Sequence, residues 1–303
     1  MAQVMQDLSG FAGTLWDREF ILAFKKRDSL FNFFRTKSVP PGVKTVNVPV
    51  FGGLTANAWV PGGGDIVTLQ AGTRSTVAIS MDKSFETSVL NDSIEELQTD
   101  VDDRAAVIEE ITNALLGQID TDLLTMLGAY TGIPAAQQFA TATEVAADAS
   151  SVATELERLI MDANAKMDSV MGASAGGRFV IVDSWPYRRL IGGSSKQSPE
   201  VPAANFAYSS GMANPIQGCQ IVPATTTSRS YDSYNTRTSI KCYLCQPSAV
   251  AIGVQKLPRL DVTWQGLYKS FLLSGDVLYG LKEAVVGSIC EMTIKVDGNL
   301  FGL

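Results

Sequence analysis

The longest regular pattern in the sequence is residues 92–127, DSIEELQTDVDDRAAVIEEITNALLGQIDTDLLTML. Apolar residues recur there at every third or fourth position, which predicts one long amphipathic α-helix; they are Ile94, Leu97, Val101, Ala105, Ile108, Ile111, Leu115, Ile119, Leu123 and Met126. Ser93 and Glu96 fit a capping box at its start. At a rise of 1.5 Å per residue the helix would be about 50 Å long. We expect a spine that supports a flat domain, and no second heptad segment offers it a coiled-coil partner within the chain.

The segment before this helix, residues 43–81, predicts two β-arms joined by a long tip. Apolar residues alternate in each arm: Val46, Val48 and Val50 in the first, and Val77, Ile79 and Met81 in the second. Pro49 indicates an edge strand. Between residues 45 and 80 the only charged residues are Asp65 and Arg74. Because a solvated hairpin normally carries more charge, we expect this one to lie on another chain.

The N-terminal region, residues 14–35, has aromatic residues at roughly helical spacing, with Lys25, Lys26 and Arg27 between them. The pattern fits an ordinary surface helix or an arm that docks on a partner. Residues 1–50 carry a net charge of +3, whereas residues 82–122 carry −10. We therefore expect the arm to run along a spine helix, its own or a neighbour's.

The remaining chain predicts an α+β fold. A linker of small residues, 135–150, precedes a helix whose apolar face runs from Val152 to Val170. A short buried strand at 178–183, a short helix at 185–191 and a long loop at 192–218 follow. The predicted strands after the loop are residues 219–223, 240–254, 262–264, 270–279 and 285–296.

Composition argues against several classes of protein. The net charge of −7 is not that of a nucleic-acid reader, which normally has a basic face. The sequence has no apolar run of about 18 residues, so we expect no membrane-spanning helix. Four cysteines in 303 residues favour a reduced setting.

Two short motifs could suggest chemistry. Residues 172–176 match G-x-S-x-G around Ser174, but a serine hydrolase needs a strand before the serine, a helix after it and a base, and the chain has no histidine. Cys242 and Cys245 form a C-x-x-C, yet alternation along a strand would point them to opposite faces. We predict a protein that is not an enzyme and has no cofactor or metal; a serine hydrolase is a distant alternative.

Several stretches, in this order, carry a family resemblance: residues 42–49, 54–56, 61–64, 77–82, 91–92, 179–182, 216–223 and 278–282. Together they resemble the major capsid proteins of tailed bacteriophages, the Hong Kong ninety-seven fold. The resemblance implies four parts, namely an N-terminal arm (1–42), an extended loop (43–81), a peripheral domain with the spine helix (82–131 and 266–303) and an axial domain (132–265).

This resemblance also implies function. Members assemble as hexamers and pentamers of an icosahedral virion capsid around double-stranded DNA, which they enclose without reading its sequence. The implied partners are further copies, a portal and, in some cases, separate scaffolding or decoration proteins, with assembly in the host cytoplasm. A cellular nanocompartment shell of the same fold is the alternative.

The arm and the loop supply the predicted contacts between subunits: Phe24, Lys25, Lys26, Arg27, Phe31, Leu54, Trp59, Val60, Asp65 and Arg74. Some members of the family cross-link a lysine of the loop to a neighbour's asparagine. This sequence has no lysine between Lys44 and Lys83, so we predict no such cross-link.

Overall fold

The computed structural model describes residues 30–51, 74–92, 104–130, 133–146, 148–171, 177–193, 213–224, 229–231, 237–268, 270–285 and 287–297. Most of the predicted arm, the tip of the predicted loop and the predicted capping box lie outside these residues. The chain forms two compact units. One contains the described parts of residues 84–118 and 256–278, and the other those of 30–83, 119–255 and 279–303.

The long helix is α3, Arg104–Gly128, with 25 residues and a length of about 37 Å. Its buried side chains follow the predicted stripe and include Ile111, Leu115, Ile119 and Leu123. The prediction that the helix begins at Asp92 is wrong, because Asp92 ends strand β4, Lys83–Asp92. Phe85 and Thr87 are half-buried between exposed neighbours, which is the alternation of a strand.

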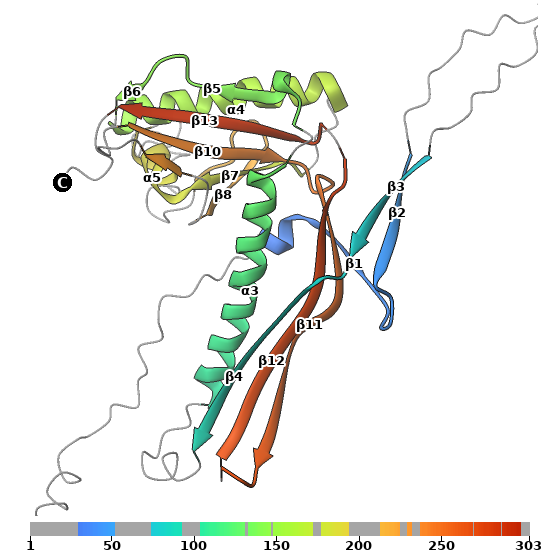
Figure 1. The fold of residues 1–303 in the computed structure, drawn as a ribbon. Helices are drawn as coiled ribbons and strands as arrows, with labels where there is room; N and C mark the ends of the chain where they lie inside the picture. The colour runs from blue at the N-terminus through green and yellow to red at the C-terminus, as the bar shows by residue number, and fades with distance from the viewer. Residues whose placement is uncertain are drawn as a thin grey trace, which may run out of the picture. The chain divides into compact units, whose positions relative to one another are not determined.

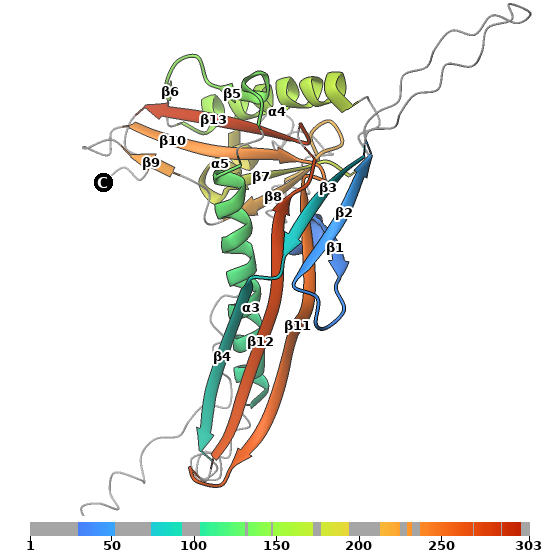
Figure 2. The same cartoon turned by 45° about the vertical axis from the view of Figure 1, so that its right-hand side comes forward.

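Strand β4 belongs to a four-stranded sheet with the order β1-β11-β12-β4. The other three strands are β1, Arg35–Ser38; β11, Val250–Gln265; and β12, Ser270–Glu283. Figures 1 and 2 show β4, β11 and β12 side by side as long strands. β1 is short and runs parallel to the start of β11, with Arg35 opposite Ala251.

The start of the described chain differs from the predicted helix at 14–35. Residues Leu30–Phe33 form a single 3-10 turn, η1, and Arg35 already begins β1. The backbone N–H of Arg35 donates to the carbonyl oxygen of Pro247, and that of Val39 donates to Val254. These bonds hold the segment as a strand, so the helical prediction fails there.

A second sheet has seven strands, five of them in the order β5-β13-β10-β7-β8, with β6 beside β13 and β9 beside β10. Its strands are β5, Gln138–Ala140; β6, Val145–Ala146; β7, Phe179–Asp183; β8, Gln220–Ala224; β9, Arg229–Tyr231; β10, Arg237–Cys245; and β13, Ile289–Asp297. β10 and β13 are antiparallel, with Ile240 opposite Ile294, and β7 and β8 are parallel.

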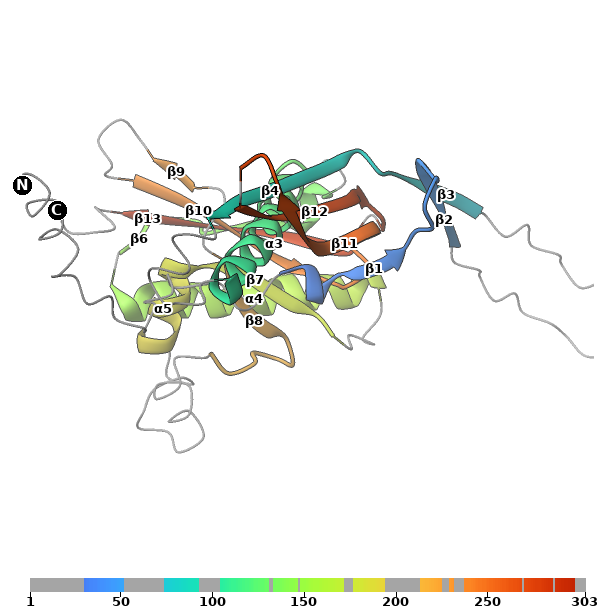
Figure 3. The same ribbon diagram turned by 90° about the horizontal axis from the view of Figure 1, so that it is seen from below.

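Two helices, α4 (Ala149–Met171) and α5 (Ser184–Gly193), lie on one side of β10 and β13 (Figure 3). Their apolar faces bury Leu156, Ile160 and Leu190 in one cluster with strand residues such as Leu244 and Met292. Both helices and β7 confirm the predicted elements. Val170 is an exception to the predicted apolar face, because its side chain is exposed at the end of α4.

Two further predictions need correction. The linker predicted at 135–150 contains the 3-10 turn η2, Ala135–Gln137, and strands β5 and β6, both of which pair with β13. The strand predicted at 240–254 is two strands, because a turn at Gln246–Ala249 separates β10 from β11. In both cases pairing with a distant strand decides the outcome, and the local pattern does not contain that information.

The predicted β-arms are present. β2, Thr45–Phe51, and β3, Arg74–Ser80, form a two-stranded antiparallel sheet with Val48 opposite Val77. Within the described residues β2 pairs with β3 alone, which confirms the prediction that Pro49 marks an edge strand.

Candidate assembly surface

Exposed apolar side chains gather at one end of the four-stranded sheet. Figures 1 and 2 both show the end of β4 beside the turn that joins β11 to β12. The large apolar residues exposed there are Val89, Leu90, Val262, Trp264, Leu267 and Tyr268, which we call the sheet-end patch. Leu257 is also exposed, farther back on β11. A cluster of this kind is typical of a surface that binds another protein.

The turn after β11 presents the most exposed members of the patch. Leu267 is 87% exposed and Tyr268 is 63% exposed. The N–H of Tyr268 donates to the carbonyl oxygen of Gln265 at 3.1 Å, which closes the turn. Trp264 packs edge-on against Phe271, with 4.9 Å between ring centroids, and stays 50% exposed. The side chains of Trp264, Leu267 and Tyr268 are therefore accessible to a binding partner.

The β2–β3 hairpin offers a second surface. Val46, Val48 and Val77 are half-buried, and Ile79 is fully buried. Of the predicted contact residues in this region, the structure places only Arg74, as the first residue of β3 opposite Phe51. Leu54, Trp59, Val60 and Asp65 lie outside the described residues.

The described end of the predicted arm packs on its own chain. The N–H of Leu30 donates to Oδ1 of Asp120 on α3 at 2.9 Å. Phe33 and Phe34 both contact the ring of Phe179, with centroids 5.2 Å and 5.1 Å away. Phe31 is half-buried in η1, and the other predicted arm contacts, Phe24, Lys25, Lys26 and Arg27, lie outside the described residues.

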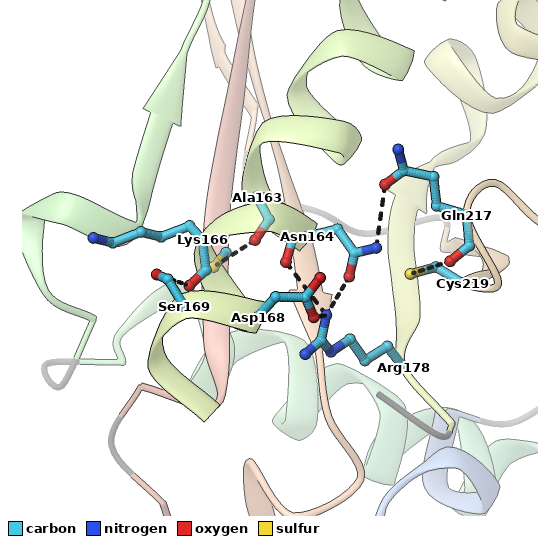
Figure 4. A network of polar contacts seen from close by, with 9 residues as sticks. Ala163, Asn164, Lys166, Asp168, Ser169, Arg178, Gln217 and Cys219 are labelled. Atoms are coloured by element: carbon cyan, nitrogen blue, oxygen red, sulfur yellow. Dashed lines mark hydrogen bonds and ion pairs between the residues drawn. The ribbon is translucent and has the colours of Figure 1, made fainter. Parts of the chain in front are cut away.

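A buried polar network joins α4 to the start of β7 (Figure 4). Arg178, whose side chain is 1% exposed, donates from Nη1 to both oxygens of Asn164 and to Oδ1 of Asp168. Asn164 in turn donates from Nδ2 to Oε1 of Gln217 at 3.2 Å. The network ties the last turns of α4 to the Ile216–Cys219 turn that precedes β8.

Searches against protein-family models and against curated proteins found no match. Solved structures do match. A structure of Mycobacterium phage Che8 aligns with a TM-score of 0.66 and 17% identity, over 93% of this chain and 97% of that chain. The capsid of Cyanophage P-SCSP1u aligns with a TM-score of 0.69 and 18% identity, over 96% and 95%. The mature capsid of bacteriophage PhiM1 aligns with a TM-score of 0.67 and 13% identity, over 93% and 91%.

The chain has the phage major capsid fold. The likeness covers nearly the whole chain in each comparison. It confirms the α+β fold class and the resemblance in fold that the order of the sequence elements predicts.

Within this capsid fold, the G-x-S-x-G stretch does not have the element order of a nucleophile elbow. α4 precedes the G-x-S-x-G stretch and β7 follows it, the reverse of the order in a nucleophile elbow. Ser174 itself lies outside the described residues. In the described part of the chain, no three His, Cys, Asp or Glu side chains are placed to hold a metal, and no helix is long and apolar enough to cross a membrane.

The four thiols of this capsid fold are free and buried. Desolvation raises the pKa of Cys242 from 9.0 to about 12 and that of Cys290 likewise to about 12. Burial also raises the pKa of Cys219 and Cys245. The thiolate is the reactive form, so these groups are inert at neutral pH and serve as core residues.

The sheet-end patch is the feature of the capsid fold that our sequence predictions missed. Its residues come from two segments, 89–90 and 262–268, which only strand pairing brings together. The one local signal is Leu267 and Tyr268 directly after Gly266, because large apolar residues are unusual in a turn.

Proposed function

We propose that this chain is the major capsid protein of a tailed bacteriophage and assembles into the hexamers and pentamers of an icosahedral shell around double-stranded DNA. The observation that carries the proposal is the agreement in fold over more than nine-tenths of both chains with the solved capsids of Cyanophage P-SCSP1u and bacteriophage PhiM1. The role is structural and not enzymatic.

The proposal takes up the four parts expected from the sequence: an arm (1–42), an extended loop (43–81), a peripheral domain (82–131 and 266–303) and an axial domain (132–265). β13 is the exception, because it pairs with β10 in the seven-stranded sheet and therefore belongs with the axial segment. Arm and loop residues, from Phe24 to Arg74, contact neighbouring copies. A portal is a further partner, as are separate scaffolding or decoration proteins where the phage has them, and the DNA is enclosed without sequence-specific binding. Assembly takes place in the host cytoplasm.

We assign the sheet-end patch to contact with a second copy of this chain. Trp264, Leu267 and Tyr268 are at least half exposed, and a contact that buries them is favoured because burial of apolar surface contributes about 25 cal/mol per Å². A shell subunit needs several separate contact surfaces, each of modest strength, since many weak contacts add up to a stable assembly. The patch provides one such surface, and the hairpin provides another.

The direct test is the mass and shape of the purified full-length protein. We expect sedimentation and electron microscopy to show rings, capsomers or closed shells far above the mass of a monomer. The measurement is repeated at high concentration and with the phage's scaffold where one exists. A single monomeric species under all of these conditions contradicts the proposed function.

A second prediction concerns the sheet-end patch. Replacing Trp264, Leu267 and Tyr268 together with serine should leave the fold intact, because all three side chains are at least half exposed. We expect the concentration needed for assembly to rise about tenfold or more, equivalent to at least about 1.4 kcal/mol of contact energy. Light scattering as a function of protein concentration measures the concentration at which assembly begins.

The matched control for the patch is Val170→Ser, which removes an exposed apolar side chain from the end of α4, outside the patch. It should assemble as the unaltered protein does. If the triple variant also assembles at the unaltered concentration, the patch is not a contact between copies.

A further inference from the structure

The base of the β2–β3 hairpin lies against two glycines, Gly253 on β11 and Gly280 on β12. A Cβ added to Gly280 would lie 2.0 Å from the carbonyl oxygen of Ser80, 2.9 Å from its carbonyl carbon and 2.9 Å from Cε of Met81. The nearest obstacle is backbone, which cannot rotate away as a side chain can. Any side chain at position 280 therefore has to displace the end of β3.

The second glycine meets a softer obstacle. A Cβ added to Gly253 would lie 2.4 Å from Cε of Met81, 3.3 Å from its Sδ and 3.4 Å from Cγ2 of Ile79. A methionine side chain has three rotatable bonds, so its methyl group can move at small cost. Both glycines therefore lie in close contact with the end of the hairpin, but an added side chain should be tolerated better at position 253 than at position 280.

Neither glycine is explained by backbone conformation. The glycines with positive φ among the described residues are Gly42, Gly177, Gly218 and Gly287. Glycine within a strand lowers stability relative to alanine, because it loses more backbone entropy on folding. Close approach of another group is the usual reason for a glycine at such a place; the Ser80 backbone supplies that approach at Gly280, and the Met81 side chain supplies it at Gly253.

Hydrogen bonds hold both strands of the hairpin at its base, next to the two glycines. The N–H of Met81 donates to the carbonyl oxygen of Lys44 at 2.9 Å, which closes the base of the hairpin. Gln255, two residues after Gly253, donates from Nε2 to the carbonyl oxygens of Pro40 at 2.9 Å and Val43 at 3.3 Å. The chain that enters β2 and the chain that leaves β3 are both held on β11 and β12.

We propose that Gly253 and Gly280 form a seat that sets the direction in which the hairpin leaves the body of the subunit, and that this direction is needed for contact with a neighbouring copy. The second half of the statement rests on the proposed function. The absence of a Cβ at Gly280 lets the Ser80 backbone approach closely. The hydrogen bonds of Met81 and Gln255 then keep the hairpin from rotating about this contact.

The seat is tested first in the isolated subunit, by the distance between spin labels at Thr76→Cys on β3 and Lys295→Cys on β13, both exposed positions. The four native thiols are buried, so labelling is selective. In Gly280→Ala the Ser80 carbonyl has to retreat by about 1.4 Å to reach an ordinary contact of 3.4 Å. We expect the label distance to shift or broaden, and the concentration for assembly to rise about tenfold.

Two further variants separate the seat from a general loss of stability. Gly253→Ala should have a smaller effect on the label distance than Gly280→Ala. Adding Met81→Ala to Gly253→Ala should restore the original distance, because it removes the Met81 methyl group. Met81→Ala should not rescue Gly280→Ala, because it removes the contact with Cε of Met81 but leaves the 2.0 Å clash with the Ser80 carbonyl oxygen. Gly117→Ala on α3 is the matched control, because an added Cβ there meets nothing within 4 Å.

The outcomes distinguish the seat from the proposed function. An unchanged label distance in Gly280→Ala overturns the seat, whatever happens to assembly. A shifted distance with unaltered assembly overturns the claim that the direction matters between copies. If the unaltered protein does not assemble at all, the proposed function fails, while the label distances still decide whether the seat exists.

Discussion

Replacing Asp168 with alanine is expected to lower the free energy of unfolding by about 2–3 kcal/mol. Removing one partner of a buried ion pair typically costs about 3–5 kcal/mol, because the other charge stays buried without compensation. Here Arg178 is 1% exposed but Asp168 is 41% exposed. Solvent already screens part of the interaction, so we expect a loss just below that range.

Urea unfolding of the unassembled subunit measures the loss, and a surface ion pair on the same helix provides the control. Asp162 lies 2.9 Å from Arg158, with both side chains close to half exposed. Asp162→Ala should therefore cost only about 0.2–1 kcal/mol. Equal losses for Asp162→Ala and Asp168→Ala would contradict the importance of the buried pair.

A variant without the buried charge shows how much of the loss comes from the ion pair. Arg178→Met keeps an unbranched side chain in the core but removes the guanidinium. In that background Asp168→Ala should cost close to nothing, since the half-exposed carboxylate no longer compensates a buried cation. The difference between the two backgrounds is the coupling of Asp168 with Arg178.

Local patterns predict the parts of this fold that bury one continuous face. The three-to-four spacing along α3 and α4 and the alternation in β2 and β3 give correct elements because each of them buries one side along its length. Pro49 marks an edge for a local reason as well, since proline has no N–H to donate to a further strand.

Long-range pairing explains the failures. β1 exists because Arg35 and Val39 donate to Pro247 and Val254, more than 200 residues away in sequence. The short strands β5 and β6 exist because they pair with β13 near the end of the chain. No local signal at residues 35 or 138 indicates such partners.

The candidate contact surfaces divide in the same way. A charge-poor hairpin is visible in the sequence, because the absence of Lys, Arg, Asp and Glu over a stretch is a local property. The sheet-end patch is not, since β4 and the β11–β12 turn meet only through the sheet. The Arg178 network is likewise invisible in the sequence. Asn164 and Asp168 on α4 contact Arg178, and Gln217 on the turn before β8 contacts Asn164, and only the fold brings these segments together.

The buried thiols lead to a prediction about alkaline pH. Cys242, Cys245 and Cys290 are fully buried, and desolvation raises the pKa of each, for Cys242 and Cys290 from 9.0 to about 12. Between those values the folded state keeps a proton that the unfolded state releases. The stabilisation is therefore complete below about pH 9 and is lost as the pH rises toward 12.

We expect the free energy of unfolding to fall by about 1.4 kcal/mol per pH unit for each of these thiols above pH 9. For three thiols this is about 4 kcal/mol per unit, so a subunit of ordinary stability, about 5–15 kcal/mol, should unfold within a few pH units. Urea unfolding at a series of pH values measures the slope.

Cys242→Ala is the control variant. It lowers stability at every pH by leaving a small cavity, but it should also reduce the thiol contribution to the slope by about a third. Ionisation of lysines and of most tyrosines contributes equally in both proteins and cancels in the comparison; Tyr243 is the exception, because Cys242 is one of the groups that raise its pKa. An identical slope in the variant would show that the Cys242 thiol titrates in the folded protein as it does in the unfolded chain.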